Sequence, residues 1–277
     1  MTDPTTLGAA AVEHLGWLRL RELSPKSIRQ RELALRLLAG HLAPRGLLDA
    51  TSRDLDAWQR AVAGTLAARS RASYVSNIAE FYRWAVREGR LPADPSAVLI
   101  RPKLTPLRPK PVSDRDATRA ESSVPEEVRV WLVLAGKSGL RAGEIASLCR
   151  ADVLDELDEP LLLLHGKGGK SRYVPLHPLA LAGLREWGMP DSGPLFVDDG
   201  GAQLTGAQVS QRANHVLRKL RVPSLHKWRH RFATELYRQT GDLLLVRDIL
   251  GHSSVAVSEI YAESVRAASA YKAVAAL

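Results

Sequence analysis

Apolar residues recur at helical spacing through the first hundred positions of the chain, with short polar breaks between the stretches. Ser24 and Pro25 form one break, where the serine can cap and the proline can begin a helix. Thr51 and Asp54 have the spacing of a capping box, and Gly89 ends the last apolar stretch. The expected helices cover residues 7–23, residues 25–42, a segment that begins after Thr51, and residues 69–89. The pattern predicts a small four-helix domain within residues 1–100.

The helical periodicity stops at residues 101–120, which contain four prolines and a run of basic side chains. Such a composition is typical of an extended segment between two domains. We therefore predict an interdomain linker over residues 101–120. Its positive charges could lie along DNA phosphates, or the segment could be a solvated tether.

The chain after this linker mixes helical and strand patterns. Pro125 begins one helical stretch, and residues 141–150 carry another. Residues 160–176 combine an apolar run, a glycine-rich turn and a β-branched stretch, which together predict a β-hairpin. Helical patterns then resume and continue to the C-terminus. We predict a mainly α-helical protein whose second domain, residues 121–277, contains a small β-hairpin or sheet.

The composition indicates which binding partners and which cellular compartment to expect for this protein. Lysine and arginine number 39 against 30 aspartate and glutamate, and the net charge of +9 favours a polyanionic partner, nucleic acid first. The single Cys149 cannot form an internal disulfide, which indicates a reducing compartment such as the bacterial cytoplasm. We find no signal-peptide pattern and no apolar stretch of the roughly 18 residues that span a bilayer. The expectation is a cytoplasmic protein without a membrane partner.

Two segments of the second domain carry cations that could bind phosphate. Arg141 stands at a helix start, and Glu144 follows one turn later, able to hold the guanidinium or the arginine backbone in place. The same spacing also occurs in ordinary surface ion pairs. Lys167 lies in the glycine-rich turn, where it is either a solvated lysine or a cation that acts on a substrate. The turn is no P-loop, because the Walker spacing is absent and the flanks are strands.

Two further segments lie nearer the C-terminus. A helix that begins at His226 brings His226 and Arg229 onto one face. A zinc site would need more Cys, His or carboxylate ligands at ordered spacing, so we expect neither a metal nor another cofactor. His252 follows a glycine that ends a helix, and Tyr261 lies nine positions further on. On its own, Tyr261 could be a half-buried packing residue.

The four segments together resemble the tyrosine recombinase, or phage integrase, family. They read GLRAGE, GKGGKSRYVPL, HKWRHRFAT and LGHSSVAVSEIY, in the order and spacing of that family. Residues 23–42 and 81–103 also resemble the family's SAM-like core-binding domain. The resemblance covers essentially the whole chain. It implies a two-domain DNA clamp, with a core-binding domain over residues 1–100 and a catalytic domain over residues 121–277.

The resemblance assigns six catalytic residues. They are Arg141, Lys167, His226, Arg229, His252 and Tyr261. Tyr261 would attack phosphorus to give a 3′-phosphotyrosine, which keeps the bond energy, so that cleavage and rejoining need neither metal nor ATP. Two planar guanidinium groups match the charged transition state, and Lys167 would protonate the leaving 5′-oxygen. By the same resemblance, His226 takes the tyrosine proton or holds it in a network, and His252 donates to a phosphate oxygen.

Some residues depart from the family pattern without replacing a catalytic position. Trp228, Arg231 and Glu235 stand where leucine, a small hydroxyl residue and histidine are common, and the usual threonines before the nucleophile are missing. Arg231 and Glu235 favour a phage or mobile-element integrase without an arm-binding domain over a Xer-type enzyme that resolves chromosome or plasmid dimers. A non-catalytic DNA-binding protein would share the helices, and a type IB topoisomerase would share the chemistry. The catalytic residues argue against the first and the four-helix domain against the second.

The resemblance also implies an assembly. Double-stranded DNA would be the substrate, and the helix-forming residues 263–277 would dock into a neighbouring copy to build a homotetramer on DNA. The other interpretation is that this segment packs against its own catalytic domain. An accessory factor that sets the direction of recombination is a further candidate partner.

Overall fold

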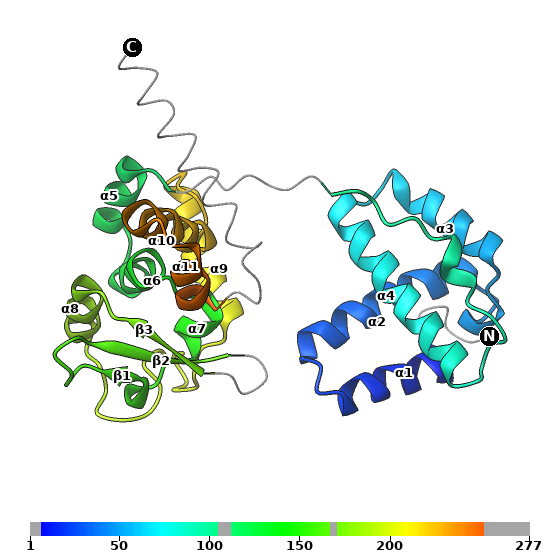
Figure 1. Cartoon of the computed structure of the whole chain (residues 1–277), viewed down its shortest axis with the longest axis horizontal. Coiled ribbons are helices and arrows are strands. Elements are labelled where there is room, and N and C mark those ends of the chain that lie inside the picture. The colour runs from blue at the N-terminus through cyan, green and yellow to red at the C-terminus, as the bar shows by residue number, and fades with distance from the viewer. Residues whose placement is uncertain (1–6, 105–111, 167–170, 252–277) are drawn as a thin grey trace, which may run out of the picture. The chain divides into compact units, whose positions relative to one another are not determined.

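The computed structural model describes residues 7–104, 112–166 and 171–251, and the chain divides into two compact units, Met1–Pro106 and Leu107–Leu277 (Figure 1). The fold is mostly helical with one small sheet, as the sequence pattern predicts. Within the described ranges, every helix is too short or too polar to cross a bilayer.

The first unit contains the four predicted helices. They are α1 (Ala9–Leu20), α2 (Pro25–Leu42), α3 (Ser52–Ala63) and α4 (Ala68–Arg87), with the 3₁₀ turns η1 (Leu47–Asp49) and η2 (Pro95–Val98). Ser24 and Thr51 cap α2 and α3, because each side-chain oxygen accepts a backbone N–H three residues on at 3.3 Å. Gly89 turns the chain after α4 with a φ of 67°. The capping signals in the sequence are therefore confirmed.

Aromatic side chains of α4 fill the core of this unit. Phe81, Tyr82 and Trp84 are buried, and the Tyr82 hydroxyl donates to the Leu47 carbonyl at 2.8 Å. His14 of α1 is fully buried against them, with its ring centroid 5.0 Å from that of Trp84. Neither ring nitrogen of His14 has a hydrogen-bond partner among the described residues. The imidazole therefore serves as a packing group in the core.

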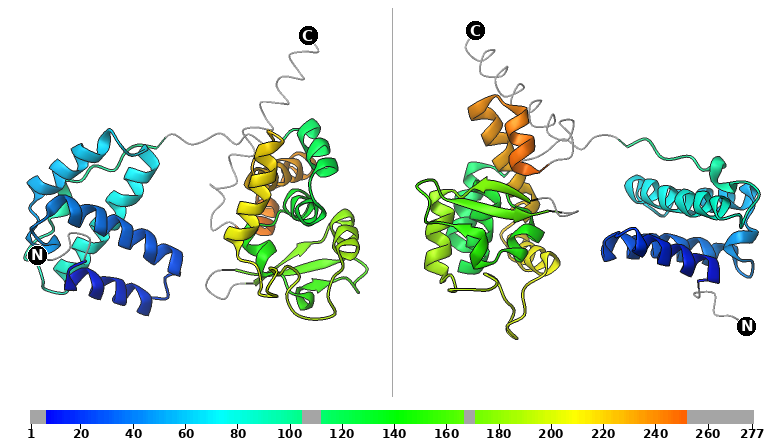
Figure 2. Two further views of the ribbon diagram at one scale, coloured as in Figure 1. Left: turned by 180° about the vertical axis from the view of Figure 1, so that it is seen from behind. Right: turned by 60° about the horizontal axis from the view of Figure 1, so that its bottom comes forward.

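Helix α6 lies at the centre of the second unit, where it contacts α8, α9 and α10. The helices of this unit are α5 (Asp114–Ser123), α6 (Glu126–Lys137), α7 (Ala142–Ser147), α8 (Pro178–Trp187), α9 (Gly206–Lys219), α10 (Leu225–Thr240) and α11 (Leu243–Leu250). The short helix α7 packs on α9, and α11 packs on α10. The sheet lies toward one end of the unit and α5 toward the other (Figures 1 and 2).

The predicted β-hairpin is present and has a third strand beside it. The strands are β1 (Val153–Leu154), β2 (Leu161–His165) and β3 (Ser171–Pro175), in the order β1-β2-β3 and antiparallel throughout. Leu163 lies opposite Tyr173, so the register brings Leu162 opposite Val174, and both of these face the core. The alternation of the hairpin residues is what fixes this pairing.

Part of the segment expected to be a linker is folded, which corrects the sequence interpretation. Residues 114–120 belong to α5, whose N-cap Ser113 accepts the backbone N–H of Asp116 at 3.1 Å. Val112 is buried in the core of the second unit. The helix buries only Ala117 and Ala120, so its apolar face is too small to show as periodicity in a polar sequence.

The helix expected over residues 141–150 is also shorter than predicted. Helix α7 ends at Ser147, and residues Arg150–Asp152 form the 3₁₀ turn η3. The Asp152 carboxylate accepts the backbone N–H of Cys149 at 2.8 Å, and Cys149 forms a bridge to Pro194. The local cap of η3 and the bridge to Pro194 end the helix where helix propensity alone would extend it.

Candidate active site

The first candidate arginine follows a turn that requires glycine. Gly139 has a φ of 76°, and a Cβ atom there would lie 2.5 Å from Cδ1 of Phe232 on α10. The chain passes through the buried Leu140 to Arg141, which is the N-cap of α7. The Arg141 side chain is 41% exposed, so its guanidinium is open to a ligand.

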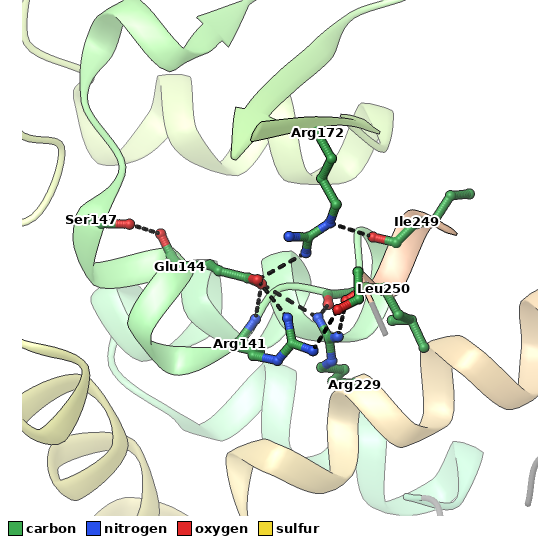
Figure 3. A network of polar contacts seen from close by, with 9 residues as sticks. Arg141, Glu144, Ser147, Arg172, Arg229, Ile249 and Leu250 are labelled. Carbon is green, nitrogen blue, oxygen red and sulfur yellow. Dashed lines mark hydrogen bonds and ion pairs between the residues drawn. The ribbon is translucent and has the colours of Figure 1, made fainter. Parts of the chain in front are cut away.

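Glu144 binds three arginines with one buried carboxylate (Figure 3). Its Oε2 accepts the backbone N–H of Arg141 at 2.8 Å, and its Oε1 accepts the Arg141 guanidinium at 2.7 Å. The guanidinium groups of Arg172 and Arg229 reach the same carboxylate at 2.9 Å and 3.4 Å. The sequence analysis expected Glu144 to hold either the guanidinium or the backbone of Arg141, and the structure shows both contacts.

The charges of this cluster leave it positive. Burial raises the pKa of the Glu144 carboxyl group, but the N–H of Arg141 and the charges of Arg229, Arg172 and Arg141 together lower it further, below its usual range. The carboxylate is therefore ionised at neutral pH. Three guanidinium groups around one carboxylate keep a surplus of positive charge, which suits an anionic ligand such as phosphate.

Arg229 enters the cluster from α10. It is 3% exposed, and its guanidinium donates to the carbonyl oxygens of Gly139 and Leu250 as well as to Glu144. Its neighbours therefore come from the turn before α7 and from the end of α11. Held by these contacts, the planar group has one orientation, as recognition of a phosphoryl group requires.

His226 lies one turn before Arg229 in the same helix and has an exposed side chain. Partial loss of hydration lowers the pKa of this imidazole, and the positive charges of Arg229, Lys227 and Arg141 lower it further. Its ring also meets that of His230 edge to face, with centroids 4.6 Å apart. A lowered pKa keeps His226 neutral near pH 7, the form that accepts a proton.

The structure brings Arg141 and Arg229 together around Glu144, and the charges of both arginines act on His226. Lys167, His252 and Tyr261 lie outside the described residues. The catalytic roles of all six residues therefore remain predictions.

The hairpin that carries Lys167 is tied at its base to the rest of the unit. His165, the last residue of β2, has its Nδ1 3.0 Å from the Ser171 hydroxyl and its Nε2 3.1 Å from Asp152. Asp152 belongs to η3, so the contact joins both strands to the segment before the sheet. These contacts hold the end of β2 against the start of β3 and against η3.

Arg172 belongs to the cluster, although the sequence pattern alone did not predict it as a site residue. It lies within the GKGGKSRYVPL segment on β3, and its side chain is only 17% exposed. One signal was present: residues two apart in a strand share a face, so Arg172 lies on the same face as the buried Val174. An arginine on the buried face of a strand needs an acidic or carbonyl partner.

The residues that depart from the family pattern have local contacts. Trp228 is buried, and a Cβ atom at Gly136 would lie 3.1 Å from its ring, so the glycine makes room for the larger side chain. Arg231 pairs with Asp114 of α5 and donates to the Val112 carbonyl at 2.9 Å. Glu235 pairs with Arg238 on the surface of α10.

Comparison with known protein families identifies both halves of the chain. The model of the phage integrase family matches residues 115–267, and that of the phage integrase N-terminal SAM-like domain matches residues 17–89. The chain belongs to the phage integrase family. Its members named tyrosine recombinase XerC include one from Chromobacterium violaceum, 32% identical over 266 residues that cover 90% of this chain and 87% of that protein. Another, from Azotobacter vinelandii, is 34% identical over 239 residues, or 75% of this chain and 77% of the relative.

Solved structures of the integrase family share the fold. A lambda integrase dimer bound to a COC′ core site matches 91% of this chain and 76% of its own, with a TM-score of 0.74 and 19% identity. The XerH recombinase in a post-cleavage complex with palindromic difH substrate matches 91% and 80%, with a TM-score of 0.72 and 19% identity. The chain is thus an integrase-family tyrosine recombinase, with the N-terminal SAM-like domain and the catalytic domain that the resemblance implies.

Proposed function

We propose that this protein cuts and rejoins duplex DNA at specific sites through a covalent bond between Tyr261 and a 3′-phosphate. The observation that carries the proposal is the convergence of Arg141 and Arg229 on Glu144, which leaves a positively charged, sterically fixed site. A scissile phosphate fits this site, because two guanidinium forks can bind its non-bridging oxygens as charge develops there.

In the proposed reaction, each proton transfer is assigned to one of the predicted residues. The Tyr261 phenol oxygen attacks phosphorus, the bond from phosphorus to the 5′-oxygen breaks, and a phosphotyrosine ester remains. His226, neutral near pH 7, accepts the phenol proton, and Lys167 supplies a proton to the leaving 5′-oxygen. His252 donates to a non-bridging phosphate oxygen. Attack by a 5′-hydroxyl of another strand reverses the step and joins new partners.

The biological role has two candidates. The contacts of Arg231 with α5 and of Glu235 with Arg238 account for both departures, so they no longer favour integration. Sequence likeness over most of both chains to tyrosine recombinases named XerC favours the resolution of chromosome or plasmid dimers. A mobile-element integrase is the second candidate, because the fold matches lambda integrase as closely as it matches the XerH recombinase. Sequencing the DNA trapped on the protein in its host distinguishes a chromosomal site from element ends.

We also propose that the active form is a tetramer on DNA in the bacterial cytoplasm. The solved relatives include a lambda integrase dimer on a core site and a tetramer on a Holliday junction. Residues 263–277, outside the described residues, would link neighbouring copies. An accessory protein would set the direction of the reaction if the substrate is a mobile element.

Replacement of Tyr261 tests the proposed reaction. Tyr261→Phe removes only the nucleophilic oxygen, so we expect no covalent adduct on a nicked suicide substrate and near wild-type affinity in a gel shift. Wild-type protein should form a protein–DNA adduct that survives denaturant. Tyr237→Phe is the matched control, since this tyrosine lies on α10 and the hydrogen bonds of the arginine cluster described above involve other residues. An adduct formed by the Tyr261 variant would refute the assignment.

A further inference from the structure

We propose that Arg172 is a positioning residue for strand cleavage, which holds the end of α11 and the carboxylate of Glu144 in one fixed arrangement. The end of α11 is where the chain leaves for His252 and Tyr261, so its orientation sets the start of the segment that carries the nucleophile. This inference rests on the proposed function.

One planar group joins three separate elements. The Arg172 Nε donates to the Ile249 carbonyl of α11 at 2.8 Å, and its Nη2 donates to Glu144 of α7 at 2.9 Å (Figure 3). Arg172 itself lies on β3, at the foot of the hairpin that carries Lys167. The two hydrogen bonds come from different nitrogen atoms of the guanidinium, and its planar arrangement of donors allows both to form at once. A lysine at this position could satisfy one of them.

The guanidinium also lies directly against the backbone that ends α11. Gly251 has a φ of 61°, and a Cβ atom there would lie 3.0 Å from both Cζ and Nη1 of Arg172. The glycine is therefore required for its left-handed backbone and for the close approach of Arg172. The contact therefore holds Gly251, the last described residue, close against the guanidinium of Arg172.

Three arginines bind three successive carbonyl groups at this helix end. Arg172 binds that of Ile249, Arg229 that of Leu250, and Arg141 that of Gly251, the last at 3.4 Å. Unpaired carbonyls at a helix C-terminus carry partial negative charge and favour cations. Arg141 and Arg229 are the residues proposed to bind phosphate. Arg172 comes from the sheet and is the member that can hold this end while the other two act on the substrate.

The test compares variants that differ in what the side chain at position 172 can bind. Arg172→Gln keeps neither bond in its original geometry, whereas Arg172→Lys keeps the charge and one donor. We expect Arg172→Gln to bind its DNA site within about 3-fold of wild type and to form the Tyr261 adduct about 10- to 100-fold more slowly on saturating protein, because small misplacements of reacting groups cost that much. Arg172→Lys should fall between the two.

A matched control separates positioning from general support of the fold. Arg150 makes the same kind of contacts, to the Val153 carbonyl at 2.8 Å and to Asp155 at 2.9 Å, with 28% of its side chain exposed. Arg150→Gln should lower the melting temperature about as much as Arg172→Gln and leave the cleavage rate within about 3-fold of wild type. If Arg172→Gln does not fold, the comparison of Arg172→Lys with Arg150→Lys replaces it.

Three results would overturn the inference. Cleavage by Arg172→Gln at the wild-type rate would show that the end of α11 needs no such support. A defect that disappears at higher protein concentration would make Arg172 a DNA contact instead. Equal cleavage defects in the Arg150 and Arg172 variants would reduce its role to stability. If wild-type protein forms no adduct at all, the proposed function itself is wrong. The assay of wild-type protein therefore separates that outcome from a failure of this inference.

Discussion

Glu144 is the residue on which the candidate active site depends most. Its carboxylate accepts bonds from the backbone of Arg141 and from the side chains of Arg141, Arg172 and Arg229. Removal of such a partner leaves buried positive charges uncompensated, which costs more than the ion pair itself contributes. One acidic side chain thus holds the three arginines in place, and the proposed reaction gives it no contact with DNA.

Replacement of Glu144 by glutamine should therefore destabilise the second unit. We expect Glu144→Gln to reduce the free energy of unfolding by about 2 to 4 kcal/mol and to abolish most covalent adduct formation. Chemical denaturation measures the first effect and the suicide substrate the second. Glu186→Gln, an exposed residue of α8, is the control and should stay within about 0.5 kcal/mol of wild type. A loss below about 1 kcal/mol for Glu144→Gln would contradict this account.

The site residues differ in how well the sequence predicts them. Arg141 and Glu144 are three positions apart on one helix start, so their contact follows from local geometry. The approach of Arg172 to Glu144 spans 28 positions and depends on how the sheet packs on α7, which no local spacing encodes. The glycines and Lys167 make the hairpin segment conspicuous, whereas the strand alternation that indicates a buried Arg172 is a weaker signal.

At the scale of elements, the contact between α1 and α4 contains a titratable group in an apolar setting. Burial lowers the pKa of His14 to about 4, the charges of Arg31 and Arg87 act in the same direction, and that of Glu80 opposes them. The folded protein therefore favours the neutral imidazole more strongly than the unfolded chain does, where the pKa is near 6.5. Protonation must weaken the packing of this unit.

Acid should destabilise the first unit through His14. The neutral imidazole contributes its full stabilisation above about pH 6.5, and this stabilisation is lost as the pH falls toward 4. At pH 5 the free energy of unfolding should be lower by about 2 kcal/mol. Denaturation of the full chain at pH 7 and pH 5, followed by fluorescence of the neighbouring Trp17 and Trp84, measures the loss. His14→Leu should remove about that much of the pH dependence. An unchanged pH dependence in the leucine variant would exclude His14 as its source.

The elements that the sequence predicts well have strong local signals. The helices α2, α3 and α4 each combine an apolar face with a cap or a terminal glycine, and the hairpin β2–β3 has a glycine-rich segment between alternating residues. Helix α5 was missed because it buries only two alanines, and the two-residue strand β1 because it is defined solely by its pairing with β2. The pairing that defines β1 is a tertiary contact, which a linear pattern does not contain.

At the scale of the whole molecule, the proposed tetramer requires copies of the protein to act together. We expect a chain that ends after Ser264 to bind a single DNA site with nearly unchanged affinity and to lose synapsis and recombination, because the proposed docking segment is absent. Gel shifts and a two-site recombination assay measure these effects. Unchanged recombination would contradict the docking proposal, and a lower melting temperature of the isolated monomer would show that the segment packs on its own domain.

The arginine cluster also affects what an unfinished copy of the protein can do. Arg141 and the Gly251 carbonyl are 110 residues apart, and Arg229 lies between them near the far end. A ribosome delivers α7 and β3 well before α10 and α11, so Arg141 and Arg172 emerge together with Glu144 but before the carbonyl groups of Gly251 and Ile249 that they also bind. A chain that stops before α11 keeps its basic side chains but lacks the helix end on which the three arginines converge. Such a chain also ends before Tyr261, so under the proposed mechanism it has no nucleophile for strand cleavage.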